Sequence, residues 1–496
     1  MLRIRQIGLI AGPLVFIGTS ALVPPAGLSA QGLMVLAAAL WMAIWWTSEA
    51  VPMAVTAFIP LILFPLLDLG SLKTVGASYA SKAVYLTLGG FIIGLALQRW
   101  KLHIRIALLT VKAVGSQPQR VVGGFMLASA FLSMWITNTA TTVMMLPIAS
   151  SVALLLAGSD DEGEDNAQRR AKFGTALMLG LAYSASIGGM MTLVGTSTNV
   201  MFKGFFEDNY GLEIDFLDWM MVAVPIGLSL LLIAWLLLTR VLFRCVGGEQ
   251  RAITVAIDAK LAELGPMSSP ERRTLFVFLL TAGLWVGKSW LQPLLGDIKL
   301  NDASIAMFGA LLLFVIPADW RRGQFLLSWS DTRELPWGIL ILLGGGLALA
   351  GALNNFGVAS WIGANISAFD ELPIVLLIVA TVTLIIFLSE LMSNVATLTA
   401  FLPVIVAVAL GFGENPLLLA LPAAFAASCA FMLPVATPPN AIVFGSNLLS
   451  IPQMARAGLI LNIIAIPLLA IACYFLATQV FDLQLSVVPD WASATR

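Results

Sequence analysis

The chain has 496 residues, of which 59% are hydrophobic and 11% are charged, whereas about 25% of the residues in a typical soluble domain are charged. A mean hydropathy of +0.95 over the whole length excludes a water-soluble fold, and a formal net charge of −1 argues against nucleic acid as a partner. Lipid permits helical bundles and closed barrels, and the apolar segments show no alternation with a period of two. We therefore predict an all-α polytopic membrane protein.

The apolar residues form thirteen blocks, most of them close to the roughly 20 residues that cross a bilayer. In chain order they are residues 7–24, 32–48, 51–69, 83–99, 122–158, 174–204, 219–243, 273–295, 303–317, 336–356, 373–412, 416–447 and 457–481. The N-terminus resembles a signal peptide but lacks a clear small-residue cleavage site. We expect a retained first helix that also targets the chain to the membrane.

Two blocks, 122–158 and 373–412, are too long for one crossing, and each has a polar patch at its middle. We interpret both as re-entrant helical hairpins, which leaves eleven transmembrane spans. If the N-terminus is cytoplasmic and the chain lies in the inner (plasma) membrane, 20 of the 26 Lys and Arg residues fall on the cytoplasmic side. Positive residues concentrate on that side of membrane proteins, so this bias supports the layout.

The strongest functional signal is a motif found at the middle of both long blocks. The first copy reads Ser133-Met-Trp-Ile-Thr137-Asn138-Thr139-Ala140-Thr141, and the second reads Ser389-Glu-Leu-Met-Ser393-Asn394-Val395-Ala396-Thr397. Each is followed by Leu-Pro at the same distance, and the copies are 256 residues apart. Interhelical hydrogen bonding explains single Ser, Thr or Asn residues in membrane helices. It does not explain two matched nine-residue motifs.

A second pair of motifs follows the hairpins. Gly195-Thr196-Ser-Thr-Asn199 corresponds to Ala436-Thr437-Pro-Pro-Asn440, which is a small residue followed by T-x-x-N. Such residues in the middle of a span predict a broken helix with unwound backbone. An odd number of spans separates the two halves, which is typical of an inverted-topology repeat with a binding site near the midplane. Irregular backbone at that depth is tolerated where it is buried or lines a cavity.

The residue types in these motifs indicate the chemistry. Hydroxyls, asparagine oxygens and free carbonyls are hard ligands suited to a small hard cation, and the N-termini of half-helices suit carboxylates. The motifs contain neither Lys nor Arg, so an anion there is costly unless another group supplies positive charge. We therefore expect a cation and an anion to bind together, and hypothesise that dicarboxylate affinity falls when choline replaces Na⁺.

Two single residues have open roles at this stage. Glu390 adjoins the second motif, and it could orient the hairpin, coordinate a cation or take part in proton coupling; we favour the orienting role. His103, the single histidine, lies in a basic stretch and is interpreted as an ordinary interfacial residue. A membrane-embedded hydrolase would need a histidine or a similar group at membrane depth. We therefore expect a carrier rather than an enzyme, with an anion channel as the alternative.

At these motifs the sequence resembles the divalent anion/sodium symporter family, whose members transport dicarboxylates, citrate and sulfate. The run from Ser428 to Gly445 resembles the C-terminal signature of the family, and the likeness covers residues 30–480. The resemblance implies a homodimer that works by an elevator mechanism with Na⁺ as the coupling ion. It also implies scaffold helices in 1–82, 83–121 (with an interfacial helix) and 205–360 (with the cytoplasmic loop 244–272). The transport domain would comprise 122–204 and 361–447, and a C-terminal helix would occupy 448–496.

The resemblance also implies site residues. One sodium site would use Ser133, Thr137, Asn138 and Gly195, and a second would use Ser389, the Met392 backbone, Asn394 and Ala436. The substrate carboxylates would contact Thr137, Asn138, Thr139, Thr196, Ser393, Asn394, Val395, Thr437 and Pro438.

The sequence departs from the family pattern in three places. Its signatures read Thr-Asn-Thr and Ser-Asn-Val, and Ser197-Thr198 stands where the family often has two prolines. The implied function is sodium-coupled import of a C4-dicarboxylate such as succinate. A sodium-independent dicarboxylate exchanger, or a sulfate or citrate carrier of the same family, remains the alternative. Sulfate would need more donors per oxygen, and Val395 removes one hydroxyl.

Overall fold

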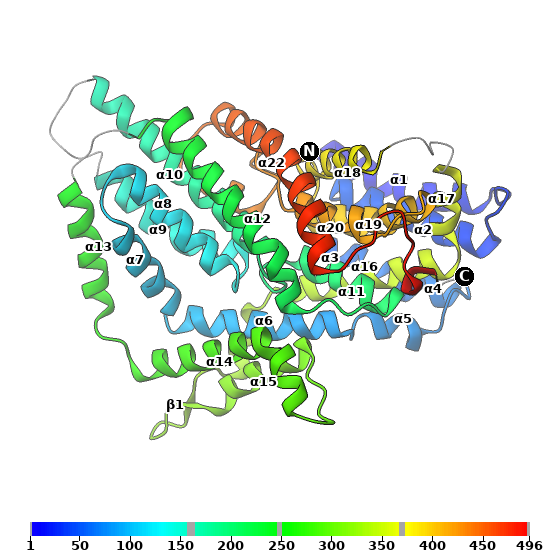
Figure 1. Cartoon of the computed structure of the whole chain (residues 1–496), viewed down its shortest axis with the longest axis horizontal. Helices are drawn as coiled ribbons and strands as arrows, with labels where there is room; N and C mark the ends of the chain where they lie inside the picture. The colour runs from blue at the N-terminus through cyan, green and yellow to red at the C-terminus, as the bar shows by residue number, and fades with distance from the viewer. Residues whose placement is uncertain (1, 156–163, 246–249, 367–372, 494–496) are drawn as a thin grey trace.

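The computed structural model describes residues 2–155, 164–245, 250–366 and 373–493, which are mostly helical (Figure 1). The first seven helices are α1 (Leu2–Ser20), α2 (Ala30–Ser48), α3 (Met53–Thr56), α4 (Ile59–Leu66), α5 (Leu72–Ser78), α6 (Lys82–Arg99) and α7 (Leu102–Val114). Serine side chains begin two of them. Ser29 accepts a hydrogen bond from the Gly32 N–H, and Ser71 accepts one from the Thr74 N–H, so each satisfies a donor that the first helical turn leaves free.

Both long apolar blocks form two helices joined by a short turn. The first comprises α8 (Pro118–Ser133) and α9 (Asn138–Leu155), and the second comprises α18 (Ile374–Ser389) and α19 (Asn394–Gly411). In each copy of the motif the serine ends one helix and the asparagine begins the next. This confirms the predicted break at the centre of each block.

The two T-x-x-N motifs also interrupt helices, as predicted. The first break, residues 191–196, separates α10 (Glu164–Met190) from α11 (Ser197–Tyr210). The second, residues 428–437, separates α20 (Leu417–Ala427) from α21 (Pro438–Phe444). Thr196 and Thr437 have extended backbone and directly precede the second helix of each pair, which is the usual geometry of an N-cap residue.

Further elements connect these units. They are α12 (Phe216–Leu236), which continues into a π-helix η1 (Leu237–Leu242), then α13 (Gln250–Leu264), α14 (Ser269–Leu291), the 3₁₀ turn η2 (Gln292–Leu294), α15 (Asp302–Val315), β1 (Pro317–Asp319), β2 (Gln324–Phe325), the 3₁₀ turn η3 (Trp329–Glu334), α16 (Trp337–Asn355), α17 (Val358–Ile366), α22 (Ile451–Val480) and α23 (Asp490–Ser493). The two strands pair antiparallel. Helix α13 lies within the segment 244–272, which was predicted as a loop, and α7 lies within 83–121, where an interfacial helix was expected.

Helices of the first half recur in the second half. The starts of α7 and α17, of α8 and α18, and of α9 and α19 are each 256 residues apart, the same spacing as the sequence motifs. The halves also pack reciprocally, because α9 contacts α21 while α19 contacts α11. Each hairpin therefore lies against the broken helix of the other half.

By length and composition, seven helices in the described ranges could cross a membrane. They are Ala30–Ser48, Gln168–Met190, Phe216–Leu242, Ser269–Leu294, Trp337–Asn355, Asn394–Gly411 and Ile451–Val480. An eighth is added if α5 and α6, which meet at 42°, form one bent span. The chain is therefore polytopic and helical. The eleven-span layout and the re-entrant character of the hairpins stay predictions.

Candidate functional site

The first hairpin turn, residues 134–137, is hydrogen-bonded to the break between α10 and α11. Thr192, in that break, donates from Oγ1 to the Met134 carbonyl and accepts from the Gly195 N–H at 3.1 Å. Across the ends of the turn, Ser133 Oγ donates to Asn138 Oδ1 at 2.5 Å. The turn and the break therefore form one unit in which polar oxygens face each other.

Two glycines permit this close approach. A Cβ atom on Gly189 would lie 2.3 Å from Asn138 Oδ1, and one on Gly195 would lie 2.8 Å from the Ser133 carbonyl oxygen. A larger residue at either position would displace an oxygen, so the backbone approach needs glycine. Thr137 lies in the same turn, where its Oγ1 accepts from the Ala140 N–H at 3.3 Å. The four residues predicted for one sodium site are therefore brought together.

The second hairpin turn, residues 390–393, is held by a carboxylate instead of a threonine. Glu390 is 3% exposed. Its Oε1 accepts from the Phe431 and Met432 N–H groups at 2.7 and 2.9 Å. Asn462 Nδ2 donates to the same oxygen at 2.8 Å, and the Leu433 N–H donates to Oε2 at 3.1 Å. All four of these partners are donors, which suits an ionised carboxylate. Of the three roles considered for Glu390, the contacts support orientation of the hairpin.

Several buried oxygens of the motifs have no partner in the described structure. Ser389 Oγ and Asn394 Oδ1, both predicted sodium ligands, are in this state. So are Thr141 Oγ1 and Thr397 Oγ1, which occupy matched positions of the two motifs. A buried polar group without a partner costs about 1–3 kcal/mol. Such a set of oxygens is therefore suited to accept a cation or water.

Two asparagines hold the unwound segments in shape. Asn199 Nδ2 donates to the carbonyls of Gly189 and Thr192 at 3.1 and 2.7 Å. In the other half, Asn440 Nδ2 donates to the Leu433 carbonyl at 3.0 Å. These asparagines were not among the predicted ligands, although the repeated T-x-x-N spacing was the signal for them. Their side chains donate to backbone carbonyls that have no helical hydrogen bond where the helix is interrupted.

The two broken helices also meet. Thr198 Oγ1 and Ser428 Oγ are 3.3 Å apart, within hydrogen-bond distance, and both side chains are buried. This contact joins a residue that follows the first break to the residue that begins the second. The two unwound segments are therefore neighbours in the protein interior.

The residues predicted to contact substrate differ in exposure. Thr137, Asn138, Thr196, Ser393 and Asn394 are half-buried, Thr139 and Pro438 are exposed, and Val395 and Thr437 are buried. Most of this set is therefore at least partly exposed, whereas the predicted cation ligands Ser133, Gly195, Ser389, Met392 and Ala436 are buried.

The chain matches a known protein family over nearly its whole length. A family model described as the sodium:sulfate symporter transmembrane region matches residues 5–480. The chain belongs to this family. It is 39% identical over 490 residues to the sodium-dependent dicarboxylate transporter SdcS of Staphylococcus saprophyticus, covering 97% of this chain and 93% of that protein. It is 38% identical, with the same coverage, to the SdcS transporter of Staphylococcus aureus. The predicted resemblance is confirmed, and these relatives are transporters rather than enzymes.

Two solved transporter structures share the fold of this symporter family member at low sequence identity. MtrF of Neisseria gonorrhoeae superposes with a TM-score of 0.60 at 13% identity, covering 94% of each chain. The YdaH transporter of Alcanivorax borkumensis superposes with a TM-score of 0.57 at 14% identity, covering 97% of this chain and 98% of that one. These likenesses concern the fold alone.

A buried network of charges links α11 to its neighbours. Lys203, which is 4% exposed, contacts Glu207 at 2.9 Å and Asp302 at 3.1 Å. Asp302, at the start of α15, also pairs with Lys288 of α14 at 3.0 Å, and Lys288 contacts Asp215. Removing one member of such a buried network leaves an uncompensated charge, which is strongly destabilising. Sequence patterns did not predict this network.

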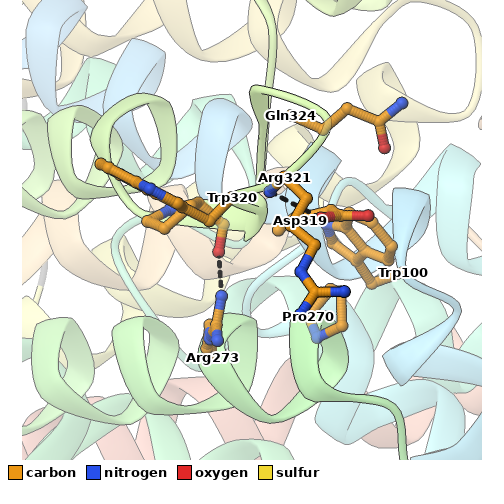
Figure 2. Close-up of a pocket in the computed structure, with 9 residues that line it drawn as sticks. Trp100, Pro270, Arg273, Asp319, Trp320, Arg321 and Gln324 are labelled. Atoms are coloured by element: carbon orange, nitrogen blue, oxygen red, sulfur yellow. Dashed lines mark hydrogen bonds between the residues drawn. The ribbon is translucent and has the colours of Figure 1, made fainter.

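Two cavities lie away from the repeated motifs. One, of about 170 Å³, is lined by apolar side chains of α2, α16, α17 and α19, so it is unsuited to a charged solute. The other, of about 660 Å³, lies beside α14 and the β1–β2 hairpin (Figure 2). Neither cavity contains a residue of the predicted sodium or substrate sites.

Proposed function

We propose that this chain is a sodium-coupled importer of C4-dicarboxylates such as succinate. The observation that carries the proposal is the pair of matched turns, each packed against a broken helix and each containing buried oxygens. One sodium ion binds at Ser133, Thr137, Asn138 and Gly195, and another binds at Ser389, Met392, Asn394 and Ala436. The substrate carboxylates contact Thr137, Asn138, Thr139, Thr196, Ser393, Asn394, Val395, Thr437 and Pro438.

The charges of the site give a physical reason for coupling. No Lys or Arg occurs in the turns or in the breaks. The nearest cation along α11, Lys203, is already paired with Glu207 and Asp302. A dicarboxylate placed at the turns without bound cations would be an uncompensated charge in the protein interior. Bound Na⁺ supplies the missing positive charge, so cation and anion bind together.

The relatives support the choice of substrate and ion. The staphylococcal proteins are named sodium-dependent dicarboxylate transporters, and the likeness covers nearly the whole chain. The sequence departs from the family pattern at Thr137 and Val395, but it keeps Asn138 and Asn394, the asparagines of the two motifs. Val395 removes a hydroxyl at the substrate side, which favours a dicarboxylate over sulfate because sulfate needs more donors per oxygen.

The repeated architecture supports an elevator mechanism. Three pairs of helices begin 256 residues apart, and the halves pack reciprocally, α9 with α21 and α19 with α11. Both observations fit an inverted repeat. In this proposal the hairpins and broken helices, residues 122–204 and 361–447, move as a transport domain. The remaining helices form the scaffold and the homodimer interface. The N-terminus is cytoplasmic, in agreement with the distribution of Lys and Arg.

The test is uptake of radiolabelled succinate by the purified full-length protein in liposomes. We expect saturable uptake with an inward Na⁺ gradient and loss of succinate affinity when choline replaces Na⁺. Equal affinity in the two salts would identify a sodium-independent exchanger instead. Non-saturable flux would identify a channel. If unlabelled citrate, 2-oxoglutarate or sulfate inhibits uptake more strongly than unlabelled succinate does, that compound is the preferred substrate.

Variants of the two turns connect this activity to the proposed site. Asn138→Ala and Asn394→Ala should abolish uptake while membrane insertion is unchanged. Asn365→Ala is the matched control, because Asn365 is exposed on α17 and its side chain donates to the Trp361 carbonyl outside the site. Wild-type uptake by either turn variant would show that the motifs serve packing alone.

A further inference from the structure

The 660 Å³ cavity lies outside the proposed sodium and substrate sites and has a cationic and aromatic lining. Its walls include Trp100 at the end of α6, Arg273 of α14, and Trp320, Arg321 and Gln324 of the β1–β2 hairpin. Figure 2 shows Arg273 rising from α14 toward the hairpin, and Arg321 reaching down from the hairpin toward the start of α14. Two guanidinium groups therefore approach the cavity from opposite walls.

The positive charge of this cavity is not neutralised by its own lining. Asp319 is the one acidic residue of the lining. Its Oδ1 already accepts from the backbone N–H groups of Arg321 and Arg322 at 2.9 and 3.4 Å, and its Oδ2 lies 3.5 Å from Arg322 Nε. Arg273 donates to the neutral carbonyl of Pro317. The guanidinium of Arg321 contacts no acceptor in the part of the chain that the structure describes.

The cavity has a fixed wall. Trp100 Nε1 donates to the Leu326 carbonyl at 2.9 Å, which joins the end of α6 to the segment after β2. Arg99 forms an ion pair with Asp331 of η3 beside it. These contacts hold the hairpin over α14. A ligand therefore meets a hairpin whose backbone is already fixed over α14, which lowers the entropy cost of binding.

Aromatic residues around the cavity indicate its depth in the membrane. Trp320 is 79% exposed and Trp329 is 73% exposed. Exposed tryptophans of membrane proteins concentrate at the level of the lipid headgroups. In the topology predicted from the sequence, Arg273 and Arg321 lie on the cytoplasmic side. Anionic lipids give that leaflet a negative surface potential.

We propose that this cavity binds the headgroup of an anionic phospholipid, with its phosphate between Arg273 and Arg321. The planar fork of a guanidinium matches phosphate oxygens and forms charge-assisted hydrogen bonds to them. Gln324 supplies a neutral donor, and Trp100 and Trp320 supply apolar surface for the glycerol end. The bound lipid links α6, α14 and the β1–β2 hairpin. This site is independent of the transport proposal.

The test is native mass spectrometry of the intact, detergent-purified protein titrated with phosphatidylglycerol. Arg321→Gln is the main variant, because that side chain makes no contact that the fold needs. Arg333→Gln is the matched control: it removes the same charge from an exposed residue of η3 that does not line the cavity. Arg273→Gln is a second variant, and its thermal unfolding is measured alongside to detect loss of its contact with Pro317.

We expect Arg321→Gln to weaken phosphatidylglycerol binding about tenfold, as loss of one charge-assisted contact implies. Arg333→Gln should change it less than about twofold. Equal losses in the two variants would show general surface attraction and overturn the proposal. Equally tight binding of zwitterionic phosphatidylcholine would also overturn it. Displacement of phosphatidylglycerol by millimolar inorganic phosphate would identify a site for a free anion rather than a lipid. Retained selectivity for phosphatidylglycerol in the presence of phosphate supports the lipid.

Discussion

Replacing Gly189 by alanine tests whether the close approach of α10 to the first hairpin turn creates the oxygen site. The added methyl would lie 2.3 Å from Asn138 Oδ1 and 2.9 Å from its Nδ2. Ordinary contacts begin at 3.4 Å, so the amide must move by about 1 Å. That displacement separates Asn138 Oδ1 from Ser133 Oγ, which are 2.5 Å apart.

The expected magnitude follows from the cost of overpacking. Inserting a methyl into a close-packed site costs about 1–3 kcal/mol, and about 1.4 kcal/mol corresponds to a tenfold change in a binding constant. Alanine also favours a helix over glycine by up to about 1 kcal/mol, which offsets part of the loss in overall stability. We therefore expect the Na⁺ concentration for half-maximal uptake to rise about tenfold or more, with a small change in melting temperature.

The assay is succinate uptake in proteoliposomes across a Na⁺ titration, with sodium-dependent thermal stabilisation of the purified protein as a second measurement. Gly174→Ala is the matched control on the same helix, because the nearest atoms to its Cβ belong to Leu448 and lie 3.9 Å away. That variant should keep the wild-type titration. A wild-type Na⁺ titration for Gly189→Ala would refute the assignment of the Ser133–Asn138 pair to a cation site.

Two further predictions concern the charged groups around the site. Glu390→Gln keeps the shape of the side chain but removes its charge and turns an NH₂ group toward the Leu433 N–H donor. A hydrogen bond to a charged group contributes about 1.5–3 kcal/mol, so uptake and melting temperature should both fall. Unchanged values in both would show that the hairpin is held by packing. Asp302→Asn leaves Lys203 and Lys288 undercompensated and should destabilise the protein by about 3–5 kcal/mol in thermal unfolding. Asp258→Asn, which alters an exposed pair with Lys112, should cost less than about 1 kcal/mol, and equal losses would contradict a special role for the buried network.

Local chemistry made much of the architecture predictable. The helix breaks at Ser133–Asn138 and Ser389–Asn394 follow from polar residues in the middle of long apolar blocks. The breaks before Thr196 and Thr437 follow from small and capping residues in segments that are otherwise long enough to span. Because the same spacing occurs twice, the sequence also predicted that the two halves carry corresponding parts of one site. Family membership followed from the same motifs.

The sequence alone therefore determined the helical membrane class, the positions of the turns and the residue types of the site, because each depends on neighbours along the chain. Only the tertiary structure decided which groups meet. Glu390 finds its donors 41 to 72 residues away, and Thr198 meets Ser428 across 230 residues. The contact between Gly189 and Asn138 and the lining of the cavity beside α14 depend likewise on how helices pack. These contacts join residues that are far apart in the sequence, so they depend on how the helices pack in three dimensions. Interactions between neighbours along the chain do not determine them.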